Sequence, residues 1–292
     1  MAGVVPLTEA PAPEALKSKA LRILGDLPPF SPILNRLMAT LAGENVSFSK
    51  LGDLMEKDTV VAGNLLNLVN SALYGRRGTI NSVRHALTLL GLEKVRNAVL
   101  GMSLTRMWHR VEVPRSWSMA GFDMHSAAVA ILGDLLAQRL QVDYPEGAFA
   151  AGLLHDLGHL LIATALPARY DAISGPHRLE SEWEVLGFTH AELSADALKV
   201  WNLPAAIQTA VRFHHNPEAD RSKWGKMPLS KVIAAANHYV NAMGVSVAAG
   251  GDPDASDAML IEKLGLDADR LEEILAEFKS EYEVMSRFFR PR

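Results

Sequence analysis

The chain has 292 residues, of which 49% are hydrophobic and 21% charged, so it can bury the core of one large or two modest domains. Its 29 Lys and Arg against 33 Asp and Glu give a formal net charge of -4, which offers no general attraction to nucleic acids or anionic membranes. The absence of cysteine excludes disulfides and thiolate metal sites, and it fits a cytoplasmic protein.

The N-terminal stretch MAGVVPLTEAPAPEALKSKA lacks a basic segment followed by an apolar one, which is the pattern of a signal peptide. Residues 1–19 therefore predict a short flexible leader. Farther along, charged residues or histidines interrupt every apolar run before it reaches the length of a membrane span. We expect a protein without a membrane partner.

Apolar residues recur at spacings of three and four along most of the chain, and few segments alternate with period two, so we predict an all-α protein. A first helix ends at the break 26–29, and Asp58 or Thr59 and Ser82 are candidate N-caps of later helices. Gly75 and Gly91 are candidate stops. The other helices predicted in this part span 31–43, 50–57, 60–75, 83–91 and 92–108.

The segment HRVEVPRSW, which contains Pro114, predicts a hinge between two helical halves. The helices predicted after it span 118–139, 147–164, 178–186, 189–201, 204–215 and 228–243. Residues 245–257 are rich in Gly, Asp and Ala and predict a mobile loop, and an amphipathic helix closes the chain. We divide the sequence into the leader, a first half over 20–112, a second half over 113–244, and the loop with its final helix over 245–292.

An adjacent His155 and Asp156 lie inside the apolar stretch AAGLLHDLGHLL, and His159 follows one turn later. Buried imidazoles and carboxylates are costly unless they are hydrogen-bonded or bound to a metal. His125 lies on the core-facing stripe of the preceding helix, and consecutive helices of a bundle are usually neighbours, so it can meet this pair. The pattern alone leaves two interpretations: a metal site, or a buried network in which Asp156 orients His125 or His155.

Three more histidines lie at predicted helix ends, where a bundle has room for a ligand. His190 begins the helix FTHAELSADALKVW, while His214 and His215 end AAIQTAVRFHHNP. Imidazoles with a carboxylate suit divalent iron, manganese, zinc or nickel, and a set of this size could hold two ions.

The stretch AFAAGLLHDLGHLLIATALP resembles the HD superfamily of metal-dependent phosphohydrolases. Residues 58–104 resemble the first half of an HDOD domain, and the matching positions are Asn70, Ser71, Tyr74, Gly75, Ile80, Ala86, Leu90 and Gly91. The resemblance covers roughly 20–240. It implies a helical bundle in two subdomains that acts as a regulatory module of bacterial signal transduction, non-catalytic or weakly catalytic, with a signalling protein as partner. The half over 113–244 would be its HD-like part with the metal site.

The chain is also similar to the HD-GYP cyclic di-GMP phosphodiesterases. That similarity implies six metal ligands, which are His125, His155, Asp156, His190, His214 and His215. It implies an alternative function as well, the metal-dependent hydrolysis of a nucleotide or cyclic dinucleotide with Asp156 and His159 as catalytic residues. Three departures argue against hydrolysis: His159 replaces the lysine of that pattern, Asn237 falls where the superfamily has a later aspartate, and no GYP tripeptide occurs.

A third interpretation takes the helices over 59–108 as a DNA-binding helix-turn-helix, with Arg76, Arg77 and Arg84 near its turn. Three arginines near a turn are more often a solvated surface, and no denser basic stripe surrounds them. We therefore do not expect a nucleic acid partner.

Overall fold

The computed structural model describes residues 11–27, 30–41, 48–70, 80–173, 178–221, 226–247 and 260–289. Within these ranges the chain folds into α-helices and short 3-10 turns and contains no β-strand; one isolated bridge joins Val142 and Met227. The prediction of an all-α protein is confirmed.

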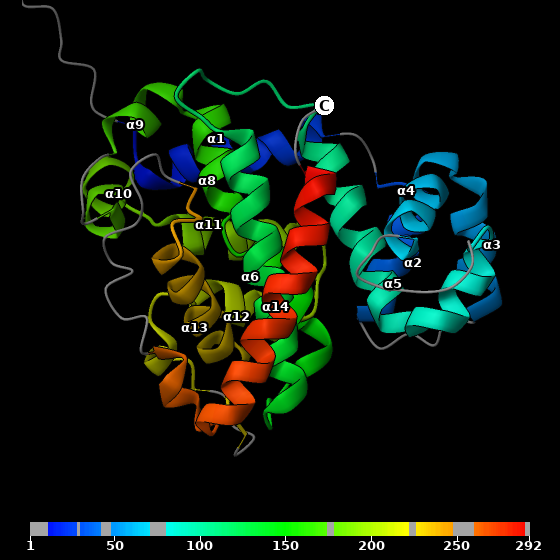
Figure 1. Cartoon of the computed structure of the whole chain (residues 1–292). Coiled ribbons are helices and arrows are strands. Elements are labelled where there is room, and N and C mark those ends of the chain that lie inside the picture. The colour runs from blue at the N-terminus through cyan, green and yellow to red at the C-terminus, as the bar shows by residue number, and fades with distance from the viewer. Residues whose placement is uncertain are drawn as a thin grey trace, which may run out of the picture.

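A small lobe contains α2 (Pro32–Leu41), α3 (Phe48–Lys57) and α4 (Thr59–Val69) (Figure 1). Asp58 caps α4, as predicted, because its carboxylate accepts hydrogen bonds from the backbone N–H groups of Val60 (3.2 Å) and Val61 (3.1 Å). The helix predicted to reach Gly75 ends at Val69, and residues 71–79 lie outside the described part of the chain.

Of the three arginines in the DNA-binding interpretation, the structure describes Arg84. Arg76 and Arg77 lie outside the described residues. Arg84 forms ion pairs with Asp53 and, at 3.8 Å, with Glu56. Its guanidinium therefore lies in the field of two carboxylates of the same lobe.

Helix α5 (Val83–Trp108) joins the small lobe to the rest of the molecule. Ser82 caps it as predicted, by accepting from the backbone N–H of His85 at 3.2 Å. The two helices predicted on either side of Gly91 are continuous except for a kink at this glycine, which has φ of 81° and ψ of 164°, a conformation that glycine adopts at little cost. Helix α5 contacts α3 and α4 as well as α7, so it links the two lobes; the hinge predicted over 109–117 follows its end.

The large lobe surrounds α6 (Met119–Arg139), which packs against α7, α13 and α14. Its other helices are α7 (Ala148–Leu154), α8 (Leu157–Ala165), α9 (Pro167–Ala172), α10 (Arg178–Leu186), α11 (His190–Val200), α12 (Ala205–Arg212), α13 (Leu229–Ala242) and α14 (Ala268–Phe289). The last of these lies along α6 and also contacts α4 of the small lobe (Figure 1). The final helix is thus part of the folded core of the molecule.

Helix α1 (Pro13–Asp26) includes residues predicted as a leader and packs on the large lobe. It begins at Pro13, inside the segment predicted as a leader, because proline is favoured in the first turn of a helix. It packs against α8 and α11, where Lys17 pairs with Asp196 at 3.0 Å, so it belongs to the large lobe. Tertiary contacts of this kind leave no periodic pattern in the sequence.

Among the described residues, two segments are long and apolar enough to cross a membrane, contrary to the expectation that none would be. They are Met119–Arg139 and Pro145–Ala165, and of their most apolar 18-residue stretches 78% and 94% are buried inside the protein. Both form the centre of the large lobe, and a helix that is covered on all sides by protein is apolar for that reason.

Asp134 on α6 is a buried carboxylate between α5 and α14. The side-chain amides of Asn97 and Gln138 donate to its Oδ2 at 3.1 and 2.9 Å, whereas Oδ1 accepts no hydrogen bond. Burial, followed by the negative charge of Glu93, raises the pKa of Asp134 to about 7. Burial and an incomplete set of hydrogen bonds both penalise the charged form.

This shift predicts an unusual dependence of stability on pH. Between pH 3.8 and about 7 the folded protein keeps the proton on Asp134, whereas the unfolded chain releases it. The free energy of unfolding therefore falls as pH rises through that window. Between pH 5 and pH 8 we expect the free energy of unfolding of the wild type to fall relative to Asp134→Asn by on the order of 2–3 kcal/mol. Urea unfolding of both proteins at the two pH values measures this; a constant difference would contradict it.

Candidate metal centre

His155 and Asp156 lie in a turn that separates α7 from α8. The apolar residues on both sides predicted one helix over 147–164, but Asp156 leaves the helical conformation, with φ of -101° and ψ of 12°. Successive residues of a helix point about 100° apart. In this turn His155 Nε2 lies 3.3 Å from Asp156 Oδ2, so both side chains face the same point.

Two glycines let neighbouring helices approach this turn closely. A Cβ on Gly152 would lie 2.7 Å from the Cα of Ala130 on α6, and a Cβ on Gly158 would lie 2.1 Å from the backbone oxygen of His190. The Gly158 N–H also donates to the hydroxyl of Ser194 on α11 at 2.7 Å. These contacts bring α6, with its buried histidine, and the start of α11 to the His-Asp pair.

Four histidine rings are fixed in orientation through Nδ1. Because carbonyl and carboxylate oxygens only accept, this nitrogen carries the hydrogen, and in the neutral ring Nε2 then has a free lone pair. The acceptors are the backbone oxygens of Val245 for His125 (2.8 Å), Gly152 for His155 (2.7 Å) and Val211 for His214 (2.6 Å), and the Glu182 carboxylate for His190 (2.8 and 3.0 Å).

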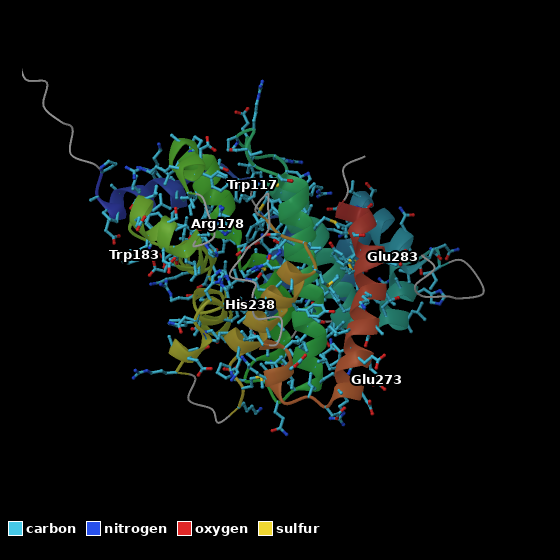
Figure 2. The ribbon with its side chains drawn as sticks, turned by 60° about the vertical axis from the view of Figure 1, so that its left-hand side comes forward. Trp117, Arg178, Trp183, His238, Glu273 and Glu283 are labelled. Atoms are coloured by element: carbon cyan, nitrogen blue, oxygen red, sulfur yellow. The ribbon has the colours of Figure 1, made fainter. Side chains whose placement is uncertain are left out.

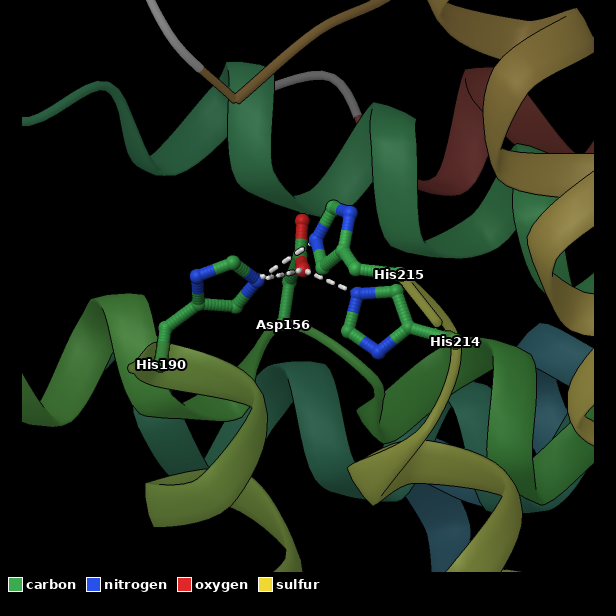
Figure 3. Close-up of side chains that lie close together, drawn as sticks. All are labelled: Asp156, His190, His214 and His215. Atoms are coloured by element: carbon green, nitrogen blue, oxygen red, sulfur yellow. Dashed lines mark hydrogen bonds and ion pairs between the residues drawn. The ribbon is translucent and has the colours of Figure 1, made fainter. Parts of the chain in front are cut away.

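The four Nε2 atoms converge on the two oxygens of Asp156. Oδ2 lies 3.4 Å from His125 and 3.3 Å from His155, while Oδ1 lies 3.3 Å from His190 and 3.7 Å from His214. Figure 3 shows Asp156, His190 and His214 together with His215. The Nε2 atom of His215 lies 3.1 Å from that of His190. The structure thus brings together all six residues that the sequence suggested as ligands.

Several polar atoms of this cluster lack the partners that a hydrogen-bonded network would supply. Asp156 Oδ1 and His214 Nε2 are buried and form no hydrogen bond with any described group. The Nε2 atoms of His125 and His155 face each other at 3.2 Å although both present lone pairs. Buried polar atoms are nearly always satisfied, and cations bound on the two sides of Asp156 would satisfy these. The cluster could therefore hold a metal ion.

The charge states of most members also suit metal ligands, which bind as carboxylate and neutral imidazole. Burial opposes ionisation of Asp156, but the surrounding histidines, His155 first, outweigh it and lower the pKa of this carboxyl well below its usual value. Burial, and then the neighbouring imidazoles, lower the pKa of His214 and His215 well below the usual value for histidine.

Glu182, which the sequence analysis missed, is fully buried on α10 and orients His190. Its carboxylate accepts from both the backbone N–H and Nδ1 of His190. Burial alone would lower the pKa of His190, but the carboxylates of Glu182 and Asp156 outweigh it and raise the pKa to about 10. A metal at Nε2 must displace that proton. The sequence does contain a sign of this role, because Glu182 lies on the same helical face as the apolar Leu179 and Leu186 and so occupies an inward position.

Replacing Glu182 by glutamine should weaken metal binding about 10- to 100-fold, because residues that orient a ligand typically contribute that much to affinity. The amide has no charge and holds the Nδ1–H of His190 less firmly. Competition between the protein and a chelator for Mn²⁺ measures the change. Glu184→Gln, at an exposed position of the same helix, is the matched control; equal affinities of the two variants would rule out this role.

A pocket of about 20 Å³ opens beside Asp156. His159 lies in its wall, where its ring stacks on His190 with centroids 3.7 Å apart. Asn237, at the position of the expected later aspartate, also lines the pocket and accepts from the amide of Asn241 at 3.0 Å. Burial, then the charges of His190 and Arg178, lower the pKa of His159 well below the usual value, so this ring is neutral.

Comparison with known proteins places the chain in a family. The HDOD domain matches it over residues 27–217, well over half of its length. The chain belongs to the HDOD family. This HDOD protein shares its fold with an HDOD domain protein of unknown function from Geobacter sulfurreducens, at a TM-score of 0.74 and 22% identity over 94% of this chain and 97% of that chain. A candidate phosphohydrolase from Shewanella amazonensis gives a TM-score of 0.72 and 23% identity over 94% and 98%.

Two further relatives differ in length from this HDOD protein. A candidate signal transduction protein from Marinobacter aquaeolei gives a TM-score of 0.72 and 22% identity over 95% of this chain and 66% of that chain. An uncharacterized protein of Treponema pallidum is 28% identical over 228 residues, which are 73% of this chain and 42% of that protein. The chain spans less than half the length of this curated relative. At these identities the likeness to the solved structures establishes the fold alone.

Proposed function

We propose that this HDOD protein is a signal-transduction module whose His-Asp cluster binds two divalent ions. The observation that carries the proposal is the arrangement around Asp156, in which each carboxylate oxygen faces a separate pair of imidazole nitrogens. His125 and His155 would hold one ion, and the histidines on the other side would hold the second, with Asp156 bridging them. Donors of this kind suit iron, manganese, zinc or nickel.

The position of the cluster supports a regulatory role. His125 belongs to α6, which packs against α7, α13 and α14, and α14 in turn contacts the small lobe. A ligand that binds one packing of these helices better than another shifts the population toward it. The module would pass such a change to a signalling protein partner.

The second candidate function is metal-dependent hydrolysis of a nucleotide or cyclic dinucleotide. The pocket beside Asp156 favours it, because a ligand could reach the cluster there. Bound ions would supply Lewis acidity and neutralise phosphate oxygens. His159, as a neutral ring in the pocket wall, would donate a hydrogen bond to the ligand, and Asp156 would hold the ions. Enzymatic turnover depends on both residues in this alternative.

One experiment separates the two functions. Elemental analysis of protein purified without chelators is followed by assays against a nucleotide and a cyclic dinucleotide with manganese or iron restored. Bound metal without turnover supports the regulatory module. Turnover at enzyme-like rates that Asp156→Ala abolishes establishes the hydrolase instead, and protein that takes up no metal refutes both.

A further inference from the structure

Arg178, in the first turn of α10, lines the pocket beside Asp156 and His159. Among the described residues that line this pocket, it is the one arginine or lysine. Its side chain lies toward the interior, whereas Trp183 of the same helix is 57% exposed at the surface (Figure 2). The pocket therefore has a cationic wall next to the metal cluster.

The guanidinium of Arg178 has donors that nothing in the described protein satisfies. Nε and Nη2 are buried and form no hydrogen bond. The nearest carboxylate oxygen, Oε1 of Glu182, lies 3.6 Å from Nε, beyond hydrogen-bonding distance, and that carboxylate already accepts from His190. The Tyr170 ring lies under the guanidinium, with its centroid 5.4 Å from the central carbon. Unsatisfied buried donors are costly, which indicates that a ligand completes them.

The two unsatisfied nitrogens lie on one edge of the guanidinium, where their N–H bonds are parallel. This edge matches two oxygens of a phosphate or carboxylate group. His159 Nδ1, also buried without a hydrogen bond, lies in the same wall and 3.4 Å from Glu182 Oε1. A cavity needs roughly 10–15 Å³ to hold one water molecule, so this pocket of about 20 Å³ admits a group of a few atoms and not a whole nucleoside.

We infer that Arg178 is the anion-binding residue of this pocket and that its Nε–Nη2 edge holds two oxygens of the phosphoryl group of a phosphate ester. The remaining oxygens of that group face the Asp156 cluster, and the rest of the ester lies outside the pocket. The inference rests on the proposed function, because ions at the cluster offset the negative charges of Asp156 and Glu182. It adds to that function the class of ligand and the side chain that recognises it.

The test compares Arg178→Gln, Arg178→Lys and a control, Arg139→Gln, which removes a surface arginine paired with Glu277 at 2.9 Å. Each protein is loaded with Mn²⁺, its manganese content is measured, and it is titrated with inorganic phosphate, adenosine monophosphate and adenosine by calorimetry. At equal manganese content we expect Arg178→Gln to bind inorganic phosphate and adenosine monophosphate at least about tenfold more weakly than the wild type does. Arg178→Lys, which keeps the charge but loses the parallel donors, should lie between them, and the control should match the wild type.

Binding of phosphate by Arg178→Gln as tight as that of the wild type overturns the inference. So does a manganese-loaded wild type that binds neither phosphate, or one that binds adenosine as well as the monophosphate. Tight binding of inorganic phosphate but not of the monophosphate replaces the ester with the free anion and overturns the assigned class. If Arg178→Gln unfolds or loses manganese, weaker binding by Arg178→Lys decides the question. A wild type without manganese refutes the proposed function, and the titration of the metal-free proteins then tests Arg178 separately.

Discussion

Asp156→Asn should abolish stable metal binding, with a loss of affinity of more than about a hundredfold, since even residues outside the coordination sphere contribute about 10- to 100-fold. The amide keeps the shape of the side chain but removes the charge that faces four imidazole nitrogens. For the wild type, a free metal concentration of about 100 times Kd should add about 2.7 kcal/mol of stability. The variant should show no such rise in Tm, and elemental analysis should find little metal after dialysis.

Asp196→Asn is the control for this experiment. Asp196 lies on α11 in the same lobe, partly exposed, and pairs with Lys17 at 3.0 Å and Arg212 at 2.7 Å. Its loss should lower stability slightly and leave metal content unchanged. If the cluster is a hydrogen-bonded network without metal, the wild type gains no stability from added ions, and Asp156→Asn differs from it equally with and without them.

Gly158→Ala should destabilise the protein by about 3 kcal/mol or more, the upper part of the range for overpacked cores. The added Cβ would lie 2.1 Å from the backbone oxygen of His190. Backbone atoms cannot rotate away as the end of a side chain can, so α8 and α11 must separate. Because His190 begins α11, metal affinity should fall together with stability. Urea unfolding and a manganese titration measure the two effects.

Gly63→Ala is the matched control, because Gly63 is exposed on α4 and a Cβ there meets nothing within 4 Å. Alanine is the better helix former, so this variant should be more stable than the wild type by about 0.5–1 kcal/mol. The same substitution is thus expected to act with opposite signs at two helical glycines. If Gly158→Ala is as stable as Gly63→Ala, the close packing of α8 on α11 is wrong.

The spacing of apolar residues predicted the bounds of regular helices well, but it did not predict the break between α7 and α8 at Asp156. The helix predicted over 178–186 has the bounds of α10, and the one predicted over 118–139 differs from α6 by one residue at its start. The break at Asp156 was invisible because apolar residues continue on both sides of it. The imidazoles that surround its carboxylate come from α6, α11 and the turn after α12, so the sequence around Asp156 does not contain them.

The candidate ligands could be suggested from the sequence because histidine is rare in apolar segments and the His-Asp pair resembles a known motif. Glu182 and Arg178 could not be selected in the same way. They lie on α10, a helix with several charged residues, of which Glu180 and Glu184 are exposed. Only the packing of α10 against His190 and His159 shows which of its charges face the cluster.

The anchoring of the four rings has a consequence for how such a centre is lost as sequences diverge. Three rings are oriented by main-chain oxygens, so substitutions at Val245 or Val211 leave these acceptors in place. The ring of His190 is held by a side chain, and a single codon change at Glu182 removes that support. A descendant could therefore keep every histidine in its alignment and still lose half of the centre, which an inventory of ligands alone would overlook.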